Sequence, residues 1–305
     1  MIRNLIHVVL AALLLGTFTG CSNKAEPGTT PDGAIRTSAE LLKQGDIAGL
    51  LEHVMPPADF AELKADWGKE ARAKPVTEED RQKFAETIRK LTAPDAETAI
   101  YAEIGPKLKQ FDAQYQKQLP MYVGMGRGWL TGMVQQNKDL SDTDKQQALA
   151  AINAIADWVQ KTRFTDPALV KQALAIICRT ARELDLKTLD QARALDFGQS
   201  MQKIHIGFEG AKDLLAVYGF SLDQTLDSIK PEVLSNDGNT TKVKVNYTLL
   251  GTPLSAETDM VRIDKHWYGK NTVEKLREHE NTTQPTPPAA PGVPANPAPT
   301  NPGNG

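Results

Sequence analysis

Cysteine and histidine are scarce in this sequence. Its 305 residues include only two cysteines, Cys21 and Cys178, and five histidines. Two cysteines can form at most one disulfide, which excludes the disulfide-rich scaffolds of small secreted domains. No two histidines stand at the spacing of a metal site, and the sequence has no His-Glu-x-x-His motif. We therefore expect neither a metal centre nor any other cofactor.

An excess of positive charge is also missing. Lys and Arg number 35 against 38 Asp and Glu, which gives a net charge of −3. Proteins that bind nucleic acids carry a basic face that attracts phosphates, so we expect no nucleic-acid partner. Aromatic residues make up only 6% of the chain, within an apolar content of 40%. The core must therefore be built mainly from alanine and leucine, which favour helices.

The apolar run at the start of the chain is too short to cross a membrane. Residues 5–15 are apolar except for His7, whereas a spanning helix needs about 20 such residues. Arg3 stands before the run and small residues follow it, as is typical of a secretory signal. We expect residues 1–20 to be a signal peptide that is removed.

The end of this signal has its own pattern. Thr19 and Gly20 stand directly before Cys21, and Ser22 follows. This arrangement resembles the lipobox of bacterial lipoproteins, which implies a diacylglycerol on Cys21 and usually an acylated amine. Two or three acyl chains anchor a protein stably. With serine directly after the cysteine, the chain is similar to Gram-negative lipoproteins of the outer membrane. We therefore expect it at the outer membrane, on the periplasmic side. An ordinary cleaved signal is the alternative.

The body of the chain reads as one mostly helical domain, residues 32–280, after a lipidated N-terminus and linker at residues 21–31. Helix starts are marked by capping side chains. These are Asp46, Thr77, Ser141, Asp166 and Thr188. A helix that opens near residue 95 is expected to be interrupted at Gly105-Pro106. Cys178 lies mid-helix beside an apolar stripe, so we expect a buried and inert thiol.

Strand patterns follow within residues 232–268. Residues 242–249 alternate, with Val243, Val245, Tyr247 and Leu249 on one face, and residues 260–267 return with Val261, Ile263 and Trp267 on the buried side. So small a sheet must lie on the helices. The predicted fold class is α+β, a mostly helical body closed by a small C-terminal antiparallel β-meander. Eight prolines among small polar residues predict a disordered tail over residues 281–305.

Residues 120–134 are the most unusual part of the body. Gly124, Gly128 and Gly132 recur every fourth residue, Trp129 stands among apolar neighbours, and Arg127 is the only charge. Three glycines cost a helix roughly 3 kcal/mol relative to alanine. The favoured explanation is a neighbouring helix that packs closely on the glycine face. A face that touches a membrane or lines a ligand site is the alternative.

Catalytic patterns are not found. The sequence has no Gly-x-Ser-x-Gly elbow and no phosphate loop. His205 and Glu209 stand one helical turn apart and could share a proton or an ion, although a structural pair is favoured. We assign no catalytic residues. His205 and Asp264 are the groups that we would expect to take part if the protein were an enzyme, which is the alternative.

A second resemblance rests on the two ends of the body. Residues 34–51, with Ala34-Ile35 and Leu50-Leu51, and the strands at 243–249 and 261–267 resemble envelope lipoproteins of the nuclear transport factor-like (cystatin-like) group. That resemblance implies a helix wrapped by a curved sheet, with room for a small ligand. Three functions stay open. They are a non-enzymatic envelope lipoprotein that binds an envelope protein or small ligand, an enzyme with such a pocket, and a lipid-handling protein that uses residues 121–134.

Overall fold

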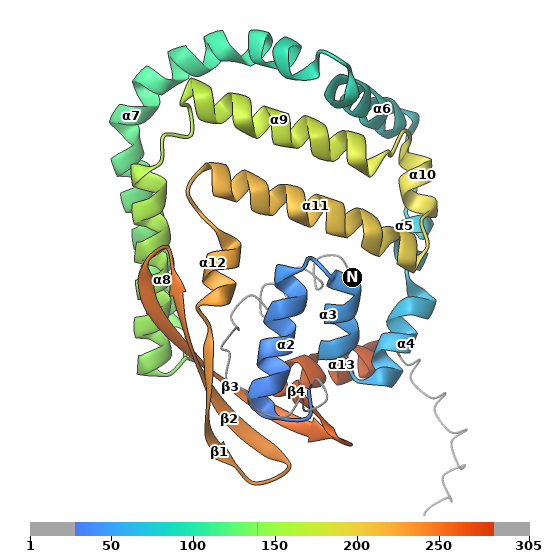
Figure 1. Ribbon diagram of the computed structural model, residues 1–305, viewed down its shortest axis with the longest axis vertical. Coiled ribbons are helices and arrows are strands. Elements are labelled where there is room, and N and C mark those ends of the chain that lie inside the picture. The colour runs from blue at the N-terminus through green and yellow to red at the C-terminus, as the bar shows by residue number, and fades with distance from the viewer. Residues whose placement is uncertain (1–27, 139, 284–305) are drawn as a thin grey trace, which may run out of the picture.

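A computed structural model describes residues 28–138 and 140–283 of the chain (Figure 1). The expected signal peptide, Cys21 and the Pro-rich tail from residue 284 onward lie outside these residues. Helices form most of the described chain, and one four-stranded antiparallel sheet follows near its C-terminal end. This confirms the predicted α+β class, a helical body closed by a C-terminal β-meander.

Four short helices open the described chain. They are α2 (Pro31–Lys43), α3 (Ile47–Val54), α4 (Pro57–Asp66) and α5 (Lys69–Ala73). Asp46 caps α3 as predicted, since its carboxylate accepts a hydrogen bond from the Gly49 backbone N–H at 2.8 Å. Gly45 just before it has φ +67°, a left-handed conformation that glycine adopts without strain. It lets α3 return antiparallel beside α2.

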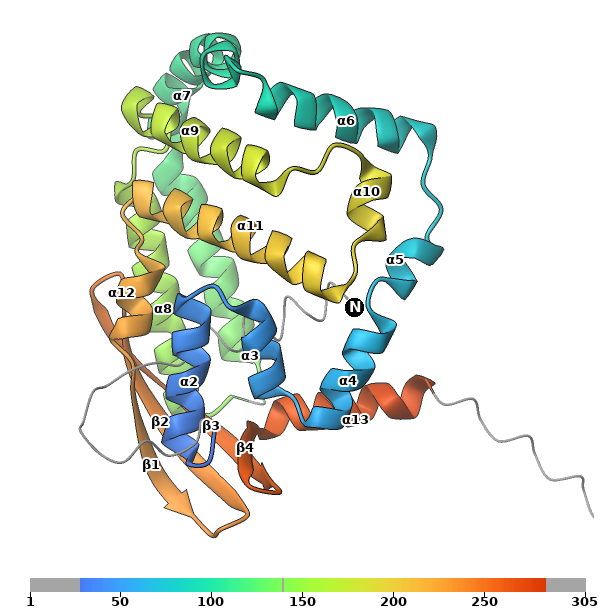
Figure 2. The same ribbon diagram turned by 45° about the vertical axis from the view of Figure 1, so that its right-hand side comes forward.

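The next six helices, all long except α10, form an arch over α2 and α3. They are α6 (Glu78–Thr92), α7 (Ala96–Gln136), α8 (Asp142–Lys161), α9 (Pro167–Leu184), α10 (Leu189–Ala194) and α11 (Phe197–Val217). Figure 1 shows α7 along the outer edge of the molecule, with α9 and α11 inside it. Figure 2 shows α6, α9 and α11 as successive layers, with the short α10 between α9 and α11. The outer edge therefore exposes one whole side of α7.

The predicted interruption of α7 at Gly105-Pro106 is wrong. The helix runs for 41 residues and keeps both Pro106 and Pro120 inside it. Proline removes one hydrogen bond and pushes away the carbonyl four residues earlier, which bends a helix. Here α7 curves around the body (Figure 1), and its contacts with α8 and α9 support both halves. Tertiary packing thus overrides the local preference of proline.

The predicted caps of the later helices are confirmed. Thr77 and Asp80 exchange hydrogen bonds at the start of α6, and the Asp166 carboxylate accepts from the Ala168 N–H at 2.9 Å at the start of α9. Cys178 of α9 is fully buried in a small apolar cluster between α9 and α7. The cluster consists of Ala96, Ile100, Val170, Leu174 and Cys178. Burial raises the pKa of the thiol, which agrees with the inert role predicted for it.

A short helix and the sheet complete the chain. They are α12 (Leu222–Asp227), β1 (Lys230–Asn236), β2 (Thr240–Leu249), β3 (Thr252–Ile263), β4 (His266–Gly269) and finally α13 (Lys270–Thr283). The strands pair in the order β1-β2-β3-β4, all antiparallel. The alternation predicted for β2 is confirmed, because Val243, Val245 and Tyr247 are buried. These side chains share one face of the pleated strand.

The second predicted strand is wrong in extent and in phase. A turn at Asp264, with φ +55°, splits residues 260–267 between β3 and β4. Tyr247 pairs with Leu254 and Thr241 with Met260, so Leu254 and Met260 face the core and are buried. Val261 and Ile263 therefore point to the other face, where they are half-buried. Trp267 of β4 is buried, as predicted. The register between β2 and β3 decides which of the two alternating sets of side chains is buried. The alternation within residues 260–267 does not by itself distinguish the two faces.

The main core lies between the sheet and the first two helices. Its fully buried large side chains are Ile35 and Leu42 of α2, Leu50 and Leu51 of α3, Leu226 and Ile229 at α12, and Val243 and Val245 of β2. Helix α13 closes the end of this core through Val273, which is buried. That helix continues to Thr283, so the prediction of a disordered tail is wrong for residues 281–283.

Candidate functional site

The outer side of α7 carries the largest group of exposed apolar side chains in the described chain. Trp129 is 67% exposed and Met125 57%. We call the following set the α7 face: Phe111, Met121, Tyr122, Met125, Trp129 and Met133, each at least half exposed. At about 100° per residue, the five members from Met121 to Met133 fall within an arc of about 120°. They form one continuous stripe.

The glycines beside this stripe have no close neighbour in the described chain. A Cβ atom added at Gly124, Gly128 or Gly132 would meet no atom of the described residues within 4 Å. The expected helix packed on the glycine face is therefore not found within the described chain. Gly124, Gly128 and Trp129 are exposed, and Gly132 is half-buried. A ligand or membrane contact there stays a prediction.

The only charge of this stretch is turned away from the stripe. Arg127 donates a hydrogen bond to the Asp157 carboxylate of α8 at 2.7 Å. Val123 and Val134 lie on the same side of the helix as Arg127 and are half-buried. Helix α7 therefore packs on α8 through its Arg127 side, and the opposite α7 face is uncharged.

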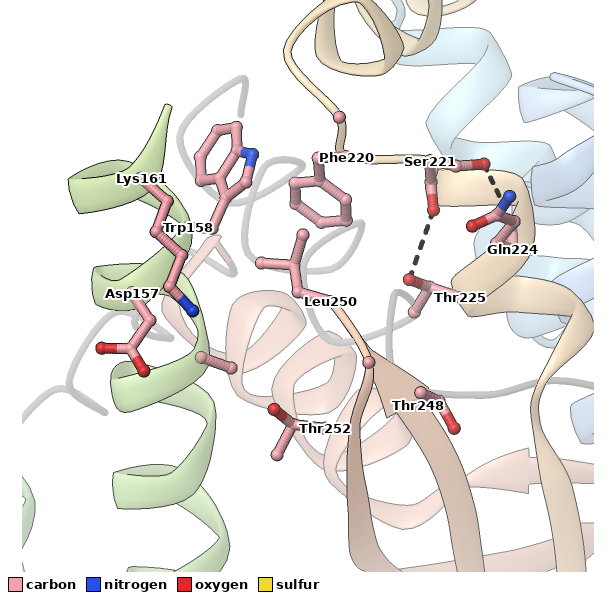
Figure 3. A pocket seen from close by; sticks show the side chains of 13 residues that line it. Asp157, Trp158, Lys161, Phe220, Ser221, Gln224, Thr225, Thr248, Leu250 and Thr252 are labelled. Atoms are coloured by element: carbon pink, nitrogen blue, oxygen red, sulfur yellow. Dashed lines mark hydrogen bonds between the residues drawn. The ribbon is translucent and has the colours of Figure 1, made fainter. Parts of the chain in front are cut away.

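A cavity of about 470 Å³ opens on the other side of α8 (Figure 3). Its apolar wall consists of Trp158 of α8, Phe220 just before α12, and Leu250 of the β2–β3 turn. Lys161 and Thr252 add polar groups. Trp158 and Phe220 meet edge to face, with ring centroids 5.6 Å apart. The Trp158 indole N–H donates to the Tyr218 carbonyl at 2.7 Å. The volume lies within the range of small-ligand pockets, about 300–1,000 Å³.

Two of the hydroxyl groups around this cavity, those of Ser221 and Thr225, have structural partners. Ser221 accepts a hydrogen bond from the Gln224 backbone N–H at 3.2 Å and so caps α12. Thr225 donates to the Ser221 carbonyl at 3.4 Å. The described residues around the cavity include no histidine, and their one carboxylate, Asp157, which lies near Lys161 (Figure 3), is paired with Arg127. The cavity therefore has the shape of a binding site but no catalytic group arranged for use.

The pair His205 and Glu209 joins a structural cluster. A ring nitrogen of His205 lies 2.9 Å from the Gly45 carbonyl, at the corner between α2 and α3. On the same helix, the Lys212 ammonium donates to the Lys43 carbonyl at 2.7 Å and to Glu209 at 3.1 Å. It also pairs with Asp223 of α12 at 2.9 Å. Burial lowers the pKa of Lys212, but the hydrogen bonds that its ammonium donates to Asp223 and Glu209, together with their negative charges, outweigh this and raise it.

Asp264 does not join this cluster. It is exposed in the β3–β4 turn, whereas His205 is engaged at the α2–α3 corner. Within the described chain, the two groups kept for an enzyme share no hydrogen bond or ion pair. The described residues also contain no group of three or more His, Cys, Asp or Glu side chains that could hold a metal ion. No described helix is long and apolar enough to cross a bilayer.

One pair of histidines was not foreseen. His53 at the end of α3 and His266 of β4 lie on either side of Gly28, where an added Cβ would stand 3.2 Å from both rings. The Gly28 carbonyl accepts a hydrogen bond from the Trp267 N–H at 2.9 Å. Burial, and then the nearby His266, lower the pKa of His53, although its bond to the Ala34 carbonyl opposes them. Sequence spacing holds no signal for this pair, because 212 residues separate them.

No protein family, no curated protein and no solved structure matches this chain. Both resemblances, to bacterial lipoproteins and to the nuclear transport factor-like group, therefore stay predictions.

Proposed function

We propose that this chain is a lipid-anchored protein of the cell envelope that acts by binding rather than by catalysis. Its anchor would be acylated Cys21, and its location the periplasmic side of the outer membrane. Its binding surface would be the α7 face. One observation carries the binding role: a stripe of six large apolar side chains that are each at least half exposed, beside which Arg127 is turned inward to Asp157.

The size of this surface supports binding. Six side chains, each about half exposed and each offering about 200 Å² when free, present about 600 Å² of apolar surface. That equals the upper end for the largest apolar patch of a typical monomer, about 300–600 Å². Such patches, when rimmed by polar residues, commonly mark interaction sites. Methionine and aromatic side chains also suit a binding surface, since they offer large contact areas that adapt to a partner.

Photo-cross-linking in growing cells tests this proposal. A photoreactive phenylalanine analogue at position 129 should give a cross-linked protein product of higher mass. The same analogue at position 86, where Glu86 is exposed on α6, is the matched control and should give none. Equal products at both positions, or no protein product at position 129, would contradict a protein-binding α7 face.

A second candidate function is contact with the bilayer. Trp129 and Tyr122 are exposed together on the α7 face, and tryptophan and tyrosine are the residues that favour the membrane interface. The mature chain without residues 1–21 should then float with lipid vesicles, and Trp129→Glu should abolish flotation. A chain that stays in the aqueous fraction with both neutral and anionic vesicles would exclude this function.

A further inference from the structure

Six residues of α7, of which Tyr115 and Gln118 are half-buried and the other four exposed, repeat at the spacing of a helix–helix seam. Phe111, Tyr115, Gln118, Tyr122, Met125 and Trp129 follow one another at intervals of four, three, four, three and four residues. This alternation of three and four residues, with a mean of 3.6, keeps the side chains on a single stripe of the helix that can face a partner helix. The seam spans residues 111–129, a length of about 27 Å at about 1.5 Å per residue.

Contacts within the seam already order its side chains. The Phe111 and Tyr115 rings stack with centroids 5.0 Å apart, and the Tyr122 hydroxyl donates to the Gln118 side-chain carbonyl at 3.2 Å. Side chains that are ordered beforehand lose less conformational entropy when a partner binds. Gln118 would be the single polar position of the seam, the kind of residue that sets register between paired helices.

The flank of the seam is open to a close approach. Gly124, Gly128 and Gly132 lie beside the stripe and have no atom of the described chain within 4 Å of their added Cβ positions. Small residues at this spacing let two helix backbones come near each other. A bilayer needs no such space, because lipid chains adapt to any surface.

Charge also favours a protein partner over an anionic lipid surface. Helices that lie in the membrane interface carry lysine and arginine beside their apolar face. The six seam side chains are uncharged. Within residues 111–129, Arg127 pairs with Asp157 and Lys117 is the exposed basic residue, and the whole chain is net negative. An uncharged face pairs with a copy of itself without repulsion between like charges.

We infer that a second copy of this chain packs on the α7 face, so that two α7 helices form a two-fold symmetric dimer. This inference rests on the proposed function and names the partner of that site. A two-fold interface uses the same surface on both subunits, and a single uncharged helix stripe is such a surface. The apolar stripes of two copies contribute about 1,200 Å² together, which reaches the lower end of stable interfaces, about 1,200–2,000 Å².

Disulfide cross-linking of the full chain in intact cells tests the dimer. Cys178 is fully buried and the lipid would occupy Cys21, so a new cysteine reports its own position. Tyr122→Cys, Met125→Cys and Trp129→Cys are made one at a time, with Glu86→Cys on α6 as the control. After mild oxidation, at least one seam variant should give a covalent dimer of twice the chain mass, and the control should give less than about a tenth as much.

Three other outcomes overturn the inference. Equal dimer from the seam variants and the control would mean random collision. Seam variants that react readily with a maleimide but give no dimer would mean an uncovered face, and the proposed function would fail as well. Seam variants that are protected from maleimide and give no dimer would mean that another protein or lipid covers the face. In that case the proposed function stands, and the inference that a second copy covers the α7 face is wrong. Because Tyr122, Met125 and Trp129 are each at least half exposed, these changes should not unfold the chain.

Discussion

Replacement of Gly128 by alanine should stabilise this protein. Glycine costs a helix about 0.8–1.0 kcal/mol relative to alanine. Elsewhere a new methyl group can clash, but at Gly128 it would meet no atom of the described chain within 4 Å. The whole change in the free energy of unfolding then comes from the higher helix propensity of alanine. We expect Gly128→Ala to raise the free energy of unfolding by about 1 kcal/mol.

Gly210 of α11 is the matched control, a helical glycine in a crowded place. An added Cβ there would lie 2.8 Å from the Thr180 Cγ2 atom of α9, inside van der Waals contact. Threonine is short and stiff on a helix, so it cannot swing away freely. Overpacking of this kind costs about 1–3 kcal/mol, which exceeds the propensity gain. Gly210→Ala should therefore lower the free energy of unfolding by up to about 2 kcal/mol.

Urea unfolding followed by circular dichroism measures both changes. The chain is made without residues 1–21 and studied at a concentration where it is monomeric, so that association does not contribute. With a slope of about 3 kcal/mol per molar urea, a change of 1 kcal/mol moves the midpoint by about 0.3 M. A lower midpoint for Gly128→Ala would refute the reasoning, because it would mean that a neighbour packs on the glycine face. Equal shifts of both variants in one direction would refute it too.

Four further predictions follow from the sequence and the fold. Cys21→Ser should remove the lipid and release the chain from the membrane fraction, and an unchanged mass of the N-terminal peptide would contradict this. Truncation after Thr283 should leave the melting temperature within about two degrees, whereas a larger loss would mean that the tail packs on the body. The pKa of folded His53 lies below its ordinary value of 6.5, so the unfolded chain takes up the proton first and stability should fall as the pH drops below 6.5; His53→Gln should reduce this dependence in pH-titrated unfolding. Lys212→Met should cost about 2 kcal/mol in urea unfolding, because it leaves the Lys43 carbonyl and Asp223 without their cation, and an unchanged midpoint would contradict that role.

Local chemistry explains why much of the fold could be predicted. Thr77 and Asp166 cap helices with side chains that reach N–H groups only two or three residues away. The alternation of Val243, Val245 and Tyr247 is likewise a property of one strand. Such patterns depend on neighbours in the chain and therefore hold before any tertiary contact forms.

The errors arose where distant segments meet. In β3, the pairing of Thr241 with Met260 decided the buried face, and β2 supplies that partner. In α7, packing on α8 and α9 kept the helix continuous through Pro106. His205 and Lys212 contact the carbonyls of Gly45 and Lys43, more than 150 residues earlier in the chain, and Glu209 pairs with Lys212. No periodicity within one segment holds information about such partners.

The sequence by itself determined the class of this protein, the caps of its helices, the buried place of Cys178 and the apolar, nearly uncharged character of residues 120–134. Only the tertiary structure decided which side of that stretch faces outward. A helix of that composition has two sides able to pack, one with glycines and large apolar residues and one with Val123, Arg127 and Val134. The second side packs on α8, where the Asp157 carboxylate stabilises the Arg127 guanidinium. Only the folded chain brings these two groups together. The α7 face was thereby left to the solvent, and it is the surface on which we place the function of this protein.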